Sequence, residues 1–351
     1  MTHRPPPGAS IRDMRRRGSL TSLLAALGVG LAALTAPPAT AASRVSDTAA
    51  SRASTTAADR APVAGAPRVA SHNVFMLSRN LYPNWGQDQR ADLIARQGVL
   101  SGQDVVVLQE AFDNEASARL LANLAAEYPH QTPVLGRSRE GWDATTGPFS
   151  DLAVEDGGVS VVSRWPIRER RQHVFTQKCG AETFAQKGFA YVRLAAPSGA
   201  VHVIGTHLQA EDGGCDDAAA VRASQLDEIR RFVDERRVPA AEPVFVVGDL
   251  NVVAGSAEFD RALARLDARR PTFAGHPFSW DPGTNSVTAA QYPGQAPQHL
   301  DYVLPLNGHP VAATWTNRTT AVHSPKWTVK SWFREYTYTD FSDHYPVLGH
   351  A

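Results

Sequence analysis

The chain has 351 residues, of which 43% are hydrophobic and 20% are charged, with 35 basic and 35 acidic side chains. A formal net charge of zero gives no overall attraction toward a polyanion, which disfavours DNA or RNA as a partner. Beyond the N-terminal segment, no stretch approaches the roughly 20 uninterrupted apolar residues that span a bilayer. We therefore expect a soluble mature protein.

The N-terminal segment has the order of an export signal. A basic stretch ending at Arg17 precedes an uncharged run from Leu20 to Leu34, and Ala39-Thr40-Ala41 matches a cleavage site. We expect residues 1–41 to be a signal peptide and the protein to be secreted, with general secretory and twin-arginine export as alternatives. Residues 42–66 contain almost no large apolar side chain, which predicts a disordered linker or pro-segment. Residues 67–351 are near the upper size of one hydrophobic core, so we expect one domain.

Short apolar runs alternate with helical patterns along the remaining chain. Residues 105–108, 201–204 and 244–247 are apolar and end abruptly in polar residues, as strands covered on both faces do. Asp113 and Asp217 are suited to cap helices whose apolar residues recur at helical spacing. The order predicts an α/β (α+β) fold with two packed β-sheets and helices on the outside.

Polar residues just past these runs, and others of similar chemistry, form a candidate site: Asn73, Glu110, His207, Asp249, Asn251, Asp301, Asp343 and His344. Each alone is more often a cap, a turn residue or a structural histidine. Together they match hydrolysis of a phosphodiester, which needs charge neutralisation, leaving-group stabilisation and an activated water. The oxygen ligands of Glu110 and Asn73 suit Mg²⁺, with Mn²⁺ or Co²⁺ as alternatives. His344 is suited to act as the general base, because an imidazole titrates near neutral pH.

The two cysteines, Cys179 and Cys215, are an isolated pair. In an exported chain such a pair is more often a disulfide than a metal site or a nucleophile. Two free thiols are the alternative.

Several segments resemble the endonuclease/exonuclease/phosphatase superfamily of DNase I-like folds. They are LQE at 108–110, GTHL at 205–208, GDLN at 248–251, LDYV at 300–303 and SDHYPV at 342–347, in the order of that superfamily. The resemblance implies a four-layer sandwich. Within the superfamily, the segments EDGGVSVVSRWPI at 155–167, KGFAYV at 187–192 and SWFREYTYTDFSDHYPV at 331–347 are similar to bacterial neutral sphingomyelinases C.

This resemblance implies a role for each site residue. Glu110 and Asn73 resemble the ligands of the central metal, and His207 and Asn251 the groups that hold the phosphate. Asp249 resembles the residue that holds the attacking or metal-bound water. Asp301 resembles the carboxylate that orients the base His344, whereas Asp343 could support the metal or tune His344. Asn114, Glu155 and Asp156 resemble a second metal site at the edge of the cleft, although residues 155–158 also read as an ordinary turn.

The resemblance implies hydrolysis of sphingomyelin, or another choline phospholipid, to a lipid and phosphocholine. Trp332 and Phe333, flanked on both sides by polar residues, are expected at the tip of a hairpin that contacts the membrane peripherally. We expect a monomer without a nucleic-acid partner. The alternatives are a secreted nuclease on the same scaffold, a broader phospholipase C, or a non-catalytic binding module.

Overall fold

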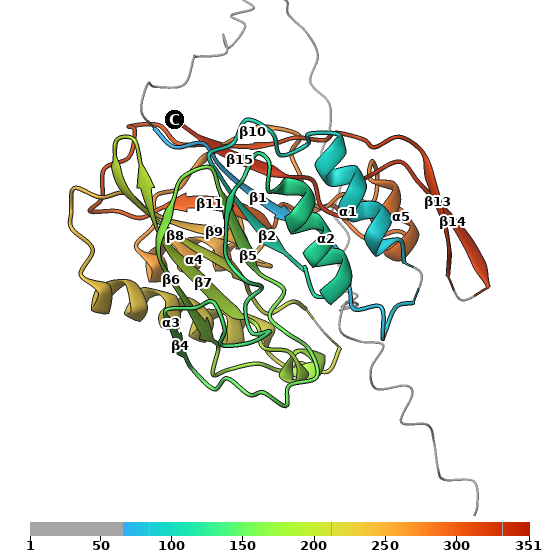
Figure 1. Ribbon diagram of the computed structural model, residues 1–351, viewed down its shortest axis with the longest axis horizontal. Coiled ribbons are helices and arrows are strands. Elements are labelled where there is room, and N and C mark those ends of the chain that lie inside the picture. Colours follow the sequence, from blue (N-terminus) through green and yellow to red (C-terminus); the bar gives the residue numbers. More distant parts are fainter. Residues whose placement is uncertain (1–65, 84, 212, 332) are drawn as a thin grey trace, which may run out of the picture.

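Two large β-sheets packed face to face form the centre of the structure, a computed structural model that describes residues 66–351 except 84, 212 and 332 (Figure 1). The predicted signal peptide, nearly all of the predicted linker, and Trp332 lie outside the described residues. The seven-stranded sheet has the order β10 (Thr272–Gly275), β12 (Thr316–Thr319), β15 (Val347–His350), β1 (Val69–Asn73), β2 (Val105–Gln109), β5 (Ser160–Ser163), β3 (His130–Gln131). The six-stranded sheet has the order β11 (Asp301–Pro305), β9 (Val244–Asp249), β8 (Gly199–His207), β7 (Gly188–Ala196), β6 (Ile167–Val174), β4 (Ala144–Thr146).

The space between the two sheets is filled by β-branched side chains. Val105 and Val107 of the first sheet pack in one buried cluster with Val203, Val247 and Val303 of the second. Burial on both faces explains why these strands appear in the sequence as continuous apolar runs rather than as alternating patterns. The three apolar runs predicted as strands are confirmed as β2, β8 and β9.

Helices cover the outer face of each sheet, which confirms the four-layer sandwich. Helices α1 (Gln87–Arg96) and α2 (Asn114–Leu124) pack on the seven-stranded sheet, and α3 (Ala218–Arg236) and α4 (Ala257–Leu266) pack on the six-stranded sheet. The predicted caps are present, because Asp113 accepts a hydrogen bond from the Ala116 amide and Asp217 from the Ala220 amide. Such caps satisfy amide groups that the helix leaves unpaired.

Smaller elements complete the fold. The short helix α5 (Ser286–Gln291) lies beside the hairpin of β13 (Trp327–Ser331) and β14 (Arg334–Tyr338), which projects from the body of the molecule (Figure 1). The short 3₁₀ helix η2 (Gly180–Phe184) precedes β7. It begins at the predicted disulfide, which is confirmed between Cys179 and Cys215. Among the described residues, no helix is long and apolar enough to cross a membrane.

The predicted site residues meet at one edge of the sandwich because of strand direction. Strands β1 and β2 are parallel, as are β8 and β9, so their carboxyl ends carry Asn73, Glu110, His207 and Asp249 to the same edge. Asp301 begins the antiparallel strand β11 directly opposite Asp249. This edge is the usual place for a ligand site in sheets of this kind.

Candidate active site and metal centre

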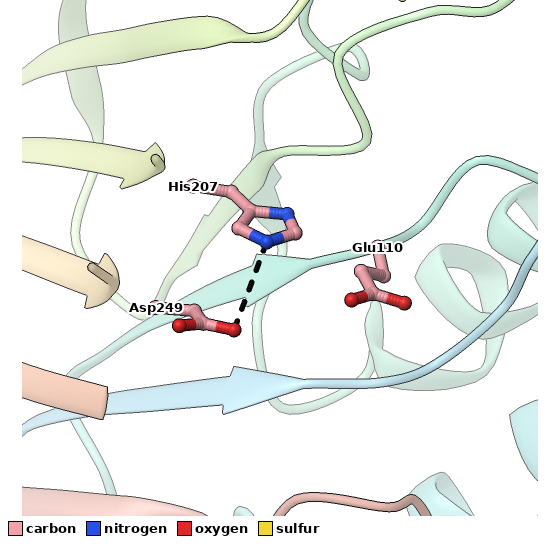
Figure 2. Close-up of side chains that lie close together, drawn as sticks. All are labelled: Glu110, His207 and Asp249. Carbon is pink, nitrogen blue, oxygen red and sulfur yellow. Dashed lines mark ion pairs between the residues drawn. The ribbon is translucent and has the colours of Figure 1, made fainter. Parts of the chain in front are cut away.

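The carboxylate of Asp249 is the centre of the site. Its Oδ2 lies 3.7 Å from His207 Nε2 and 3.8 Å from His344 Nε2, and it accepts a hydrogen bond from Asn73 Nδ2 at 3.1 Å. Its Oδ1 accepts the amide of Asn251 at 2.9 Å. Figure 2 shows His207 above Asp249, with Glu110 facing the same space. The two imidazole distances exceed a hydrogen bond, so a water or a phosphate oxygen could interact with both rings and the carboxylate.

The terminal histidine is held by a buried carboxylate. His344 Nδ1 donates to Asp301 Oδ2 at 2.7 Å, and both side chains are buried. Burial by itself would lower the pKa of His344, but Asp301, Asp343 and Asp249 together raise that pKa well above its usual value. Burial likewise opposes ionisation of Asp301, yet the charge of His344 and its hydrogen bond hold the pKa of Asp301 below its usual value. The contact with Asp301 orients the ring of His344 and leaves Nε2 facing Asp249.

Glu110 combines backbone strain with a buried carboxylate. It has a φ of 54°, in the left-handed region that residues other than glycine rarely adopt, and Asn251 has a φ of 50°. Glu110 Oε1 accepts Asn73 Nδ2 at 2.8 Å, whereas the buried Oε2 has no hydrogen-bond partner among the described residues. Burial and the nearby charge of Asp343 raise the pKa of Glu110 to about 8. A buried carboxylate that has one oxygen without a hydrogen-bond partner and is held on a strained backbone has the character of a cation ligand.

The candidate cation ligands fall into two overlapping groups. Single oxygen or nitrogen atoms of Glu110, His207 and Asp249 lie within 4.8 Å of one another, and so do those of Asp249, Asp301 and His344. Burial and the charges of Lys187 and His344 lower the pKa of His207 well below its usual value, so its ring is neutral. The first group therefore presents two carboxylates and a neutral imidazole.

Comparison with known proteins agrees with this geometry. Residues 70–344 match the profile of the Endonuclease/Exonuclease/phosphatase family. Sphingomyelinase C of Listeria ivanovii is 50% identical over 285 residues, which cover 80% of this chain and 85% of that protein. The chain belongs to the sphingomyelinase C family. Two crystal structures share its fold with a TM-score of 0.80, each covering 82% of this chain and 99% of the other. They are sphingomyelinase C from Streptomyces griseocarneus, 49% identical, and a β-toxin variant from Staphylococcus aureus with bound magnesium ions, 44% identical.

In this sphingomyelinase C homologue, Glu155 and Asp156, which were predicted for a second metal, belong to neither of the two candidate ligand groups. Asn114 is the exposed first residue of α2. Asp156 is buried, and its carboxylate accepts hydrogen bonds from Arg137 and from the Gly158 amide. Burial and Asp156 raise the pKa of Glu155 to about 7. Because Arg137 already pairs with Asp156, Glu155 is the residue of the two with the greater capacity to hold a cation. The second metal site stays a prediction.

Two supporting residues were given no role at the site by the sequence. Ser279 Oγ accepts the amides of Leu300 and Asp301, which positions the carboxylate that holds His344. Lys187 is buried and donates to the Leu208 carbonyl at 2.9 Å, next to His207. Both act through tertiary contacts, and a single serine or lysine gives no periodic pattern from which such contacts could be predicted.

Proposed function

We propose that this protein is a metal-dependent phosphodiesterase that hydrolyses sphingomyelin to ceramide and phosphocholine. The observation that carries the proposal is the arrangement of His344 and His207 around one carboxylate oxygen of Asp249, with His344 held by the buried Asp301. A base, a carboxylate that accepts a hydrogen bond from water and a second imidazole, placed this close together, are suited to in-line attack by water. Relatives named sphingomyelinase C support the choice of substrate.

Glu110 and Asn73 are the residues we assign to the central cation, for which magnesium is the first choice. The fit rests on the buried, unpartnered Oε2 of Glu110 and on the hard oxygen donors, which magnesium prefers. The cation would neutralise charge on the phosphate and stabilise the leaving alkoxide. Asn73 Nδ2 donates to Glu110 and Asp249, and its Oδ1 accepts the Phe75 amide, so Asn73 would have to exchange these hydrogen bonds to turn its oxygen toward the cation.

We assign the proton transfer to His344. In the neutral form of His344, Nδ1–H donates to Asp301, which leaves Nε2 free to take a proton from water beside Asp249, and the raised pKa stabilises the imidazolium that this transfer forms. Asp249 Oδ2 accepts the second hydrogen of that water and orients its lone pair toward phosphorus. His207 and Asn251 hold the non-bridging oxygens, and Asp343 raises the pKa of His344 through its charge.

We also propose that the enzyme is secreted, acts as a monomer and contacts membranes through the β13–β14 hairpin. Phe333 is fully exposed at the turn, with a φ of 69°, and so presents an aromatic ring away from any core. An aromatic side chain is suited to the interface between lipid and water. Trp332, the other half of the predicted pair, lies outside the described residues.

The test is release of phosphocholine from sphingomyelin vesicles, with magnesium, manganese, cobalt or a chelator. We expect turnover with a divalent cation and none with the chelator. Plasmid nicking by the same preparation, without release of phosphocholine, would point instead to the nuclease alternative. Absence of both activities in a folded, cation-loaded protein would favour the non-catalytic module.

A further inference from the structure

A second exposed apolar surface lies apart from the hairpin. Among the described residues, Leu152 is 92% exposed, Val154 62% and Phe184 45%. Single exposed apolar side chains are common, but these three are close together. The amide of Glu155, next to Val154, donates to the carbonyl of Phe184 at 3.2 Å. We call Leu152, Val154 and Phe184 the lip.

The buried side chain of Gln186 holds the chain around the lip in place. Gln186 Oε1 accepts the Ser150 amide at 2.7 Å, and Gln186 Nε2 donates to the Gly136 carbonyl at 2.6 Å. The backbone amide of Gln186 donates to the backbone carbonyl of Glu155 at 3.1 Å. Hydrogen bonds therefore fix the chain on both sides of Leu152 and Val154, and their exposure is a built feature of the fold.

The lip lies at the catalytic edge. The segment with Leu152 and Val154 leads into β5, which is antiparallel to β2. On the way, the Gly158 carbonyl accepts the amide of Ala111, the residue after Glu110. Helix η2, which contains Phe184, leads into β7, where Phe189 pairs with Thr206 beside His207. Both segments of the lip thus lead to the ends of β2 and β8 that carry site residues.

A short segment connects the lip with the hairpin. Ser78 hydrogen-bonds the Glu155 carboxylate at the base of the lip. Five residues further on, the Pro83 carbonyl accepts Ser331 Oγ at 2.8 Å, two residues before Phe333. The segment 78–83 therefore contacts the lip near one end and the hairpin at the other, and we call the three together the rim.

We propose that the lip is a second lipid-contact surface, which enters the bilayer interface together with Phe333. This inference rests on the proposed function, because a substrate in a bilayer must meet the site at this rim. Two separated apolar contacts fix the tilt of the enzyme on the surface, whereas a single tip leaves it free to rotate. A second copy of the chain is a poor occupant, because three side chains cover far less than the roughly 1,200 Å² that a stable protein interface buries.

The chemistry of the contact is apolar. Two cations near the lip already have partners, because Arg139 is paired with Asp151 and Lys178 donates to the carbonyl of Ala185, next to Phe184. The whole chain has no net charge. Binding through the lip should therefore depend little on ionic strength, unlike a basic patch on anionic lipid.

The test uses a single labelled thiol, since both native cysteines are joined in the disulfide. Leu152→Cys carries an environment-sensitive fluorophore, and the matched control is Glu235→Cys on the exposed side of α3. We expect a blue shift with sphingomyelin–phosphatidylcholine vesicles at position 152 only, unchanged in high salt. No shift at position 152 overturns the inference, as does a shift that follows protein concentration without vesicles, which indicates self-association.

A substitution series completes the test. Leu152→Ser with Val154→Ser and Phe184→Ser should weaken vesicle binding by at least about tenfold. Leu152→Ile with Val154→Ile keeps the apolar surface and should retain binding, and thermal unfolding checks that all variants fold. Equal vesicle binding by the serine and the isoleucine variants would overturn the inference that the lip contacts lipid. The wild-type protein's turnover of a water-soluble phosphocholine ester separates this result from failure of the proposed function, since that reaction needs no membrane.

Discussion

The pKa of Glu110 makes cation binding dependent on pH. Burial and the charge of Asp343 raise this pKa from 4.5 to about 8 in the cation-free protein, so the carboxyl group is largely protonated at pH 6. A cation ligand must be ionised, so binding must displace that proton. At pH 6, two units below the pKa, deprotonation costs about 3 kcal/mol, so magnesium should bind roughly a hundredfold more weakly than it binds the fully ionised protein.

Isothermal titration of magnesium in buffers of different ionisation enthalpy measures this proton directly. We expect release of close to one proton per magnesium at pH 6 to 7 and an affinity that rises with pH up to about 8. Glu110→Gln cannot ionise, so its weak residual binding should lose this pH dependence, and its turnover should fall by several orders of magnitude. An affinity of the wild type that is constant from pH 6 to 8 would refute the reasoning.

The raised pKa of Glu110 also predicts that replacing this residue stabilises the cation-free protein at high pH. A native carboxyl group with a raised pKa binds its proton more tightly than the unfolded chain does, so it lowers stability as the pH rises from 4.5 toward 8. Without divalent cations, Glu110→Gln should therefore unfold at a higher temperature than the wild type at pH 8, and at a similar temperature near pH 4.5. A wild type that is the more stable protein at pH 8 without cations would contradict this.

Three further predictions concern other parts of the molecule. His344→Ala should lower turnover by about 10² to 10⁴, and Asp301→Asn should move the acid limb of the pH–rate profile to lower pH, because the Asp301 charge raises the pKa of His344; an unmoved limb would remove Asp301 from this role. Phe333→Ser should weaken vesicle binding by about tenfold without a change in melting temperature, whereas a drop in melting temperature would indicate a packed side chain. Reducing Cys179–Cys215, which closes a separation of 36 residues, should lower the free energy of unfolding by about 4 kcal/mol on the chain-entropy model; equal denaturation midpoints with and without reductant would exclude this contribution.

The sequence by itself predicted several central strands and helix starts, and it selected candidates for the site. Continuous apolar runs predicted β2, β8 and β9 because strands buried on both faces must be apolar throughout. Asp113 and Asp217 predicted helix starts because capping is a local interaction within three residues. Glu110, His207 and Asp249 could be selected since each comes shortly after an apolar run, and the parallel pairing of strands then placed them with Asn73 at one edge.

Only the tertiary structure decided how these groups act on one another. The ion pair of Asp301 with His344 joins residues 43 positions apart, and the raised pKa of Glu110 depends on burial and on Asp343, which lies more than 200 residues away in the chain. The engagement of Asp156 by Arg137 and the exposure of Leu152 likewise follow from packing. Charge interactions and solvent exposure depend on distances in space, and those distances are established only when the two sheets close on each other.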